Sequence, residues 1–345
     1  MRIIFSCLLF ISGIFAQAQN SKSLLYLNKP LSAESINQVE ARTSGGGIEV
    51  TGVNPSEARI EVYINGNDRH DSYTKEEIQK ILDKDYDFSV TVSGNKLSAI
   101  AKQKRSFSNN WSNSISISYK IYVPTACGTH LNTSGGGISI SNLTGEQHFN
   151  TSGGGLDLSK LSGKITGRTS GGGITVTDSK DNIDLETSGG GIEAKRCSGE
   201  ISLNTSGGSI ELNELSGNIR ASTSGGNVDA EKVTGELITH TSGGNMSVTG
   251  MSGSLEASTS GGNIDVEITA TGKYVKLSNS GGSVHLEVPK GKGLDLDIHG
   301  DRIKTVGLNN FSGSLEKESI TGTISGGGTP VDIHAGSGGV TLAIK

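Results

Sequence analysis

The chain has 345 residues, which is enough for two ordinary domains or for one long array of repeats. Glycine accounts for 51 residues, aromatic residues for only 4% and proline for 5 residues, a composition typical of neither an aromatic-rich globular core nor collagen. The formal net charge of −5 excludes the basic footprint of a nucleic-acid-binding protein.

The first 18 residues have the pattern of a secretory signal peptide. Arg2 precedes the apolar stretch 3–15, and the small-x-small sequence at 16–18 predicts cleavage before Gln19. The apolar stretch is too short for a good transmembrane helix, and no later segment is apolar enough to cross a bilayer. We therefore expect an exported protein that is periplasmic, on the cell surface or extracellular, with no transmembrane segment after signal removal.

Residues 19–130 show no regular period and are expected to form a β-rich cap with one short helix. The sequence Thr74-Lys75-Glu76-Glu77 is a capping box and predicts a helix that runs through Asp83. Strands are predicted from alternating patterns at 59–64, 87–92, 96–101 and 114–123. A cap is needed because a stack of strands ends in unpaired edges.

The loop between the last two of these strands contains the candidate binding residues. Phe107 and Trp111 lie there beside Lys104 and Arg105. Aromatic and arginine side chains are the usual anchors of binding surfaces, so this loop is a candidate contact patch. The alternative is that Phe107 and Trp111 fold back over the open end of the first repeat.

A Thr-Ser-Gly-Gly motif repeats every 18 residues through the middle of the chain. An earlier copy starts at Thr43, and a degenerate copy starts at Asn279, two residues late. Self-similarity at a fixed period is the signature of a repeat architecture. The eight regular copies start at Thr133, Thr151, Thr169, Thr187, Thr205, Thr223, Thr241 and Thr259.

Each copy contains two strands with one buried face. Apolar residues stand five and seven positions after the threonine and enclose a polar residue, as Ile210 and Leu212 enclose Glu211. A second apolar-alternating strand, such as that containing Ile201, leads into the next threonine. By this alternation the threonine points inward and the serine after it points outward.

Two turns connect the strands, and the first contains the two glycines and a third residue. This third position holds only glycine, asparagine or one serine, which predicts a left-handed backbone conformation there, with Ser209 the weakest fit. Its occupants are Gly137, Gly155, Gly173, Gly191, Ser209, Asn227, Asn245 and Asn263.

These features predict an all-β, parallel β-solenoid, or β-helix, with 18-residue coils. The general rule for parallel crossovers favours a right-handed coil. Regular coils are expected at 131–284, and irregular β coils with a C-terminal cap at 285–345. Cys127 and Cys197 are about 19 Å apart along such a stack, which exceeds the reach of a disulfide and predicts two free thiols.

The sequence resembles the bacterial family known as the putative adhesins, exported β-strand-repeat proteins without a settled biochemical role. The similarity is carried by the signal peptide, the stacked Ser-Gly-Gly-Gly-Ile turns, the Val288-Pro289 step and the closing pattern at 326–333. It covers nearly all of the mature chain. The resemblance implies an envelope or surface protein and brings no functional residues with it.

Metal and cofactor signals are weak. His130 and His148 are 18 residues apart in the same outward phase, so stacked coils would place them about 4.8 Å apart, without an obvious third metal ligand. A pair of surface histidines is the simpler interpretation. The aspartate of calcium-binding nonapeptide repeats is absent from most copies, and no cofactor motif occurs.

We therefore expect a non-enzymatic, structural or adhesin-like protein that binds an envelope or surface protein or a glycan. A solenoid that binds or cleaves polysaccharide is the alternative, although Phe149 is the only aromatic residue from Thr133 to Val266 and no acid–base pair is evident. The acidic outward row that includes Glu193 and Glu211 is best explained as a solvated face that blocks aggregation. Ice binding by threonine rows is disfavoured because the threonines point inward.

Overall fold

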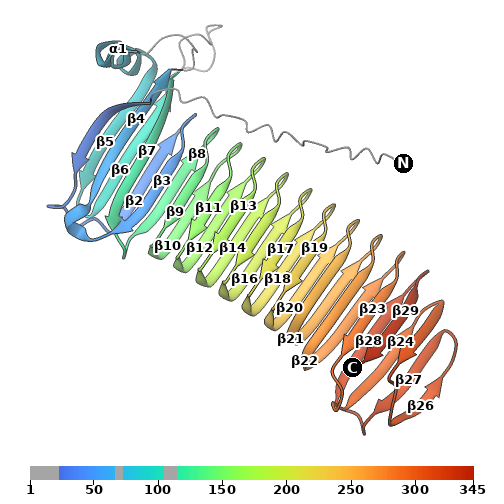
Figure 1. Cartoon of the computed structure of the whole chain (residues 1–345). Coiled ribbons are helices and arrows are strands. Elements are labelled where there is room, and N and C mark those ends of the chain that lie inside the picture. The colour runs from blue at the N-terminus through green and yellow to red at the C-terminus, as the bar shows by residue number, and fades with distance from the viewer. Residues whose placement is uncertain (1–22, 67–72, 105–114) are drawn as a thin grey trace, which may run out of the picture.

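The computed structural model describes residues 23–66, 73–104 and 115–345, and it is an all-β structure. About 65% of the chain is strand, and the described strands belong to one long, unclosed sheet of 29 strands. The molecule is elongated, with the single α-helix at one end and the C-terminus at the other (Figure 1). The predicted signal peptide lies outside the described residues, and no described helix is both long and apolar enough to cross a membrane.

The middle of the chain forms two rows of parallel strands. Each strand pairs with the strand two places further along the chain, in a register that joins residues 18 apart, such as Ile192 with Ile210. The longer strands are β8 (Gly128–Thr133), β10 (Thr144–Asn150), β12 (Ser162–Thr169), β14 (Lys180–Thr187), β16 (Ser198–Thr205), β18 (Ser216–Thr223) and β20 (Thr234–Thr241). The shorter ones are β9 (Ile138–Ser141), β11 (Leu156–Ser159), β13 (Ile174–Thr177), β15 (Ile192–Lys195), β17 (Ile210–Asn213) and β19 (Val228–Glu231), and both rows continue into β21 (Met246–Thr259) and β22 (Ile264–Asn279).

The inward and outward faces agree with the alternation in the sequence. Ile210 and Leu212 are buried, whereas Glu211 between them is exposed. The threonines of all nine Thr-Ser-Gly-Gly copies are buried, as predicted. The core is therefore one continuous apolar column between the two rows of strands.

The N-terminal flank joins the repeats through the Thr43 copy. β2 (Gln38–Thr43) pairs with β8, and β3 (Ile48–Val53) pairs with β9, so Thr43 lies beside Thr133 although 90 residues separate them. The residues in between form β4 (Arg59–Gly66), α1 (Lys75–Asp85), β5 (Tyr86–Ser93), β6 (Lys96–Gln103) and β7 (Ile115–Pro124), with the 3₁₀ helix Pro55–Glu57. The predicted strands and the capping box of Thr74 with Glu77 are confirmed.

Pairing in the flank departs from the parallel pattern of the repeats. β4 is antiparallel to β7 and to β1 (Leu24–Pro30), and β5 is antiparallel to β6. β6 and β7 are parallel to β2 and β3 and continue the two rows by one further layer. β4 therefore stands next to β7 at the edge of the short-strand row (Figure 1).

The C-terminal flank repeats this arrangement. β28 (Thr329–Ala335) and β29 (Gly339–Ile344) stack in parallel on β22 and on β23 (Val284–Val288). The intervening strands are β24 (Leu294–His299), β25 (Arg302–Val306), β26 (Phe311–Leu315) and β27 (Ser319–Ile324). β27 is antiparallel to β24 and β26, so this part of the C-terminal region departs from the parallel pairing of the repeats.

Candidate binding site at the glycine turns

The first turn of each repeat is tied to the turn before it by the buried threonine. Thr151 Oγ1 donates to the carbonyl of Gly136 at 2.7 Å and accepts from the N–H of Gly154 at 3.4 Å. The same donation, at 2.7–2.9 Å, is made by Thr133, Thr169, Thr187, Thr205, Thr223, Thr241 and Thr259. These hydrogen bonds form a ladder that connects successive turns on the inner side of the strands. The alternation in the sequence predicts this inward orientation of the threonines.

The second glycine of the motif is required by close backbone contact. A Cβ on Gly154 would lie 2.2 Å from the carbonyl oxygen of Gly136 in the neighbouring turn, and the other regular copies are equally tight. No side chain fits between backbones at that distance. This glycine therefore sets how closely successive turns stack.

The prediction of a left-handed third position is wrong. None of the residues at this position, from Gly137 to Asn263, has a left-handed φ. The left-handed residues lie in the other turn, for example Lys160 with φ 53° and Gly163 with φ 103°. The reason is that the glycines of the first turn serve close stacking, whereas the second turn reverses the chain through two left-handed residues.

The third position instead carries a ladder of side chains in the later repeats. The N–H of Asn245 donates to Asn227 Oδ1 at 2.9 Å, and the N–H of Asn263 donates to Asn245 Oδ1 at 2.8 Å. Ser209 Oγ accepts in the same way from the N–H of Asn227 at 3.2 Å. Each side chain thus satisfies the backbone donor of the next turn.

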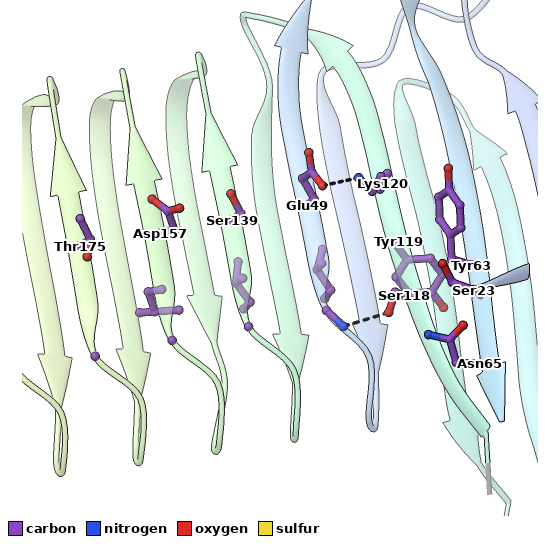
Figure 2. A pocket seen from close by; sticks show the side chains of 17 residues that line it. Ser23, Glu49, Tyr63, Asn65, Ser118, Tyr119, Lys120, Ser139, Asp157 and Thr175 are labelled. Atoms are coloured by element: carbon purple, nitrogen blue, oxygen red, sulfur yellow. Dashed lines mark hydrogen bonds and ion pairs between the residues drawn. The ribbon is translucent and has the colours of Figure 1, made fainter. Parts of the chain in front are cut away.

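In the earlier repeats the third position is glycine, and this ladder is missing. The exposed N–H groups of Gly137, Gly155 and Gly173 have no protein acceptor among the residues that the structure describes. The N–H of Gly47 differs, because it donates to Ser118 Oγ at 3.2 Å (Figure 2). The N–H groups of Gly191 and Ser209 also lack an acceptor among the described residues, so five successive turns carry free backbone donors, and those of Gly137, Gly155 and Gly173 lie at the N-terminal end of this run.

These free donors line a pocket of about 790 Å³, which we call the glycine-turn pocket. Its floor is the outward face of β3, β9, β11 and β13, and β7 and β4, which continue the same row of strands beyond β3, form the end of the pocket that we call its wall (Figure 2). The polar and aromatic side chains of the lining are Ser23, Glu49, Tyr63, Asn65, Ser118, Tyr119, Lys120, Ser139, Asp157 and Thr175.

The titratable side chains of the wall, Lys120 and Tyr63, are each paired with a glutamate. Lys120 Nζ lies 3.1 Å from Glu49 Oε2, and this hydrogen bond raises the pKa of Lys120. The Tyr63 hydroxyl donates to Glu61 Oε2 at 2.8 Å, which raises the pKa of Tyr63. Both groups keep their protons at neutral pH, so the wall offers no titrating acid or base.

Two acceptors in the pocket remain unpaired within the described part of the chain. Asn65 Oδ1 is inaccessible to solvent and has no hydrogen-bond partner there. The Asp157 carboxylate is exposed on the floor and makes no ion pair or hydrogen bond with any described residue. With the glycine N–H groups and the exposed Asp157 carboxylate, the pocket presents both donors and an acceptor to a ligand.

The predicted loop site is described only in part. Lys104 Nζ donates to the carbonyl of Asp83 at 2.7 Å and lies 3.9 Å from Asp87 Oδ1, so it is held against the end of α1. Arg105, Phe107 and Trp111 lie outside the described residues. Their role as a binding patch stays a prediction.

The two histidines of the predicted pair do lie together. The rings of His130 and His148 stack with centroids 5.0 Å apart and an interplanar angle of 11°. Desolvation and the neighbouring His148 lower the pKa of His130. No cluster of three or more metal-ligating side chains occurs among the described residues, and a metal site here stays a prediction.

Sequence reasoning missed two features of the surface. His299 and His334 also stack, with centroids 5.3 Å apart, because β24 and β28 pair across 35 residues rather than 18. The glycine-turn pocket was missed because its wall comes from β4, whose position no spacing encodes. The change from glycine to asparagine at the third position was the available signal.

Comparisons with known proteins give only distant similarities. No model of a known protein family matches the chain, and no curated protein matches it. A solved structure described as a "putative cell adhesion protein" from Clostridium sporogenes is 12% identical, with coverage of 94% of this chain and 99% of its own and a TM-score of 0.20.

A "putative adhesin" from Bacteroides fragilis is 16% identical and covers 78% of this chain and 98% of its own, with a TM-score of 0.36. A "putative lipid binding protein" from Parabacteroides distasonis is 14% identical and covers 89% and 93%, with a TM-score of 0.31. Two of the three structures thus carry adhesion names, as does the family that the sequence resembles. The structural likeness is too low to assign a function.

Proposed function

We propose that the chain is an exported, non-enzymatic β-solenoid that acts as a structural, adhesin-like protein of the cell envelope or surface. The observation that carries the proposal is the continuous double row of parallel strands, in which residues 18 apart pair over the whole middle of the chain. Such an array buries its apolar column only by stacking, and it yields a long, repetitive surface. A spacer or attachment protein needs these properties.

The proposal divides the chain into a signal peptide at 1–18, an N-terminal cap at 19–130, regular 18-residue, right-handed coils at 131–284 and a C-terminal region at 285–345. Antiparallel strands in both flanks support the role of the ends as caps, because they cover strand edges that the stack would leave open. Attachment to an envelope protein or glycan would then use surfaces near the ends.

The loop with Phe107 and Trp111 is the proposed attachment patch at the N-terminal end. The test compares the purified chain 19–345 with a Phe107→Ala/Trp111→Ala variant in a sedimentation assay with bacterial envelope material. We expect the variant to lose at least tenfold in attachment while its melting temperature stays unchanged. The matched control is Leu315→Ala, which removes an apolar side chain that is 58% exposed at the opposite end.

Export is tested on the full chain of 345 residues. We expect a processed protein that begins at Gln19 and is found outside the cytoplasm, as measured by fractionation and intact mass. Unprocessed cytoplasmic protein would overturn the proposal, and so would wild-type chain that fails to sediment with envelope material. A collapse of the melting temperature in the double variant would assign the two aromatic residues to the cap instead of the patch.

The alternative, a carbohydrate-active protein, is favoured by one observation. The glycine-turn pocket combines unpaired donors, an exposed carboxylate and a tyrosine, groups that can hydrogen-bond to sugar hydroxyls and contact a sugar ring. Binding of a glycan is compatible with the structural role, and the pocket is the place to test it.

A further inference from the structure

We propose that the glycine-turn pocket binds an extended, neutral polysaccharide chain, whose oxygens occupy the places that asparagine side chains fill in the later repeats. This inference rests on the proposed function, because it names the ligand class for a protein of the cell envelope.

The backbone donors are regularly spaced, and they face the third turn position, which carries no side chain in these repeats. Paired strands are about 4.8 Å apart, so the N–H groups of Gly137, Gly155 and Gly173 recur at that interval. A Cβ placed on Gly137 would lie 3.2 Å from the carbonyl oxygen of Gly155 and 3.8 Å from its nitrogen. Asn227 Oδ1 reaches the N–H of Asn245 from the same position, so a ligand oxygen placed there would reach the N–H of Gly155.

The fold does not require glycine at this position. Asn227, Asn245 and Asn263 occupy the same place in later turns, where their side chains satisfy the next N–H. Glycine in the earlier turns, Gly137, Gly155, Gly173 and Gly191, gives up these hydrogen bonds. Three of these four glycines, Gly137, Gly155 and Gly173, line the pocket.

The remaining groups of the pocket match sugar hydroxyls, which donate and accept at once. The exposed carboxylate of Asp157 is an unpaired acceptor, and Ser139 and Thr175 add hydroxyls along the floor. Tyr63 supplies an aromatic ring on the wall. The interval between turns is close to the length of one pyranose unit in an extended β-linked chain, so each sugar lies opposite one turn, and alternate sugars of a β-1,4-linked chain turn opposite edges toward the donors.

Two other ligand classes fit less well. An anionic chain would meet the uncompensated carboxylate of Asp157, because the only lysine of the pocket, Lys120, is paired with Glu49. A peptide that adds a strand needs an open sheet edge, but β9 and β11 are each paired on both sides. A neutral polysaccharide needs neither a cation nor an edge.

The test uses the chain 19–345 and three probes in calorimetric titrations: the β-1,4-linked hexamers of glucose and of N-acetylglucosamine, and hexagalacturonate. Gly155→Asn places an asparagine where the later turns carry one, so that it satisfies the N–H of Gly173. We expect one neutral hexamer to bind, at least tenfold weaker binding by Gly155→Asn, and an unchanged or higher melting temperature of that variant.

Asn245→Gly is the matched control, because it opens the same position outside the pocket. It should bind the neutral hexamer like the wild type and melt at a lower temperature. Should Gly155→Asn fail to fold, Asp157→Asn serves instead, with Asp229→Asn as its control on the same outward row. Asp157→Asn should lower the affinity for the neutral hexamer several-fold, and Asp229→Asn should leave that affinity unchanged.

Failure of both neutral hexamers to bind would overturn the proposal. So would unchanged affinity in Gly155→Asn or Asp157→Asn, or tighter binding of hexagalacturonate than of the neutral probes. These outcomes are separate from the proposed function. A chain that is exported and sediments with envelope material, but binds no hexamer, loses only this inference, whereas a chain that binds a hexamer but stays in the cytoplasm loses only the proposed location.

Discussion

At the scale of single residues, position within the repeat decides what a side chain does. Ile210 is buried between Ile192 and Val228 of the neighbouring strands, while Glu211 faces solvent between Glu193 and Asp229. The same rule explains why every threonine of the motif is buried and hydrogen-bonded. One position along the strand is therefore the difference between core and surface.

Substitutions at these two neighbours should have very different effects. Ile210→Asp buries an unpaired charge in the apolar column and should lower the free energy of unfolding by about 4 kcal/mol or more. Glu211→Lys on the exposed side should change it by less than about 0.5 kcal/mol. Urea unfolding followed by circular dichroism measures both, and equal losses would contradict the assignment of inside and outside.

At the scale of the element, the turn of each repeat is built by its neighbours as much as by its own residues. Gly208 lies against the carbonyl of Gly190 in the preceding turn, and the Thr205 hydroxyl donates to that same carbonyl. Gly207, one residue earlier, has room for a methyl group, with the nearest atoms at 3.5 Å. Adjacent glycines of one motif thus have different reasons to be glycine.

This difference can be tested with two alanine substitutions. Gly208→Ala would place its Cβ 2.1 Å from the Gly190 oxygen, so the turns must separate, and we expect a loss of about 3 kcal/mol or more. Gly207→Ala should stay within about 0.5 kcal/mol of the wild type, because its Cβ makes ordinary contacts. Thermal and urea unfolding give both values, and a mild Gly208→Ala would show that the stacking distance is adjustable.

At the scale of the whole molecule, the two cysteines lie in the core at places that are far apart along the stack of strands. Cys127 lies in the connection between β7 and β8, and Cys197 lies four repeats further along, in a position that elsewhere holds Leu161, Leu215 or Met251. Both are buried and free. Burial raises the pKa of Cys127 to about 12 and also raises the pKa of Cys197.

Both thiols should therefore be inert in the folded protein. At pH 8 their thiolate fraction is very small and their access is blocked, so we expect alkylation only at the rate of unfolding. Mass spectrometry after iodoacetamide treatment, with and without urea, measures this for each cysteine. A disulfide between Cys127 and Cys197 in protein recovered after export would contradict the stacking order.

The sequence by itself determined the repeat and its phase. The alternation around Ile210 and the 18-residue spacing of the threonines are local patterns that can be read from the sequence. Because equivalent units stack on one another, each residue pairs with the residue at the same position of the next repeat. The capping box of Thr74 with Glu77 was predictable for the same reason, since it is complete within four residues.

Only the tertiary structure decided where the period is interrupted. The pairing of Thr43 with Thr133 and of Val284 with Val340 crosses inserted segments whose length no repeat constrains. The conformation of the third turn position was also decided in three dimensions, because neighbouring backbones set it and not the preference of asparagine and glycine for left-handed φ. The glycine-turn pocket depends on both effects. β4 belongs to the inserted segment and lines one end of the pocket, and the turns that line the rest of it have glycine at the third position.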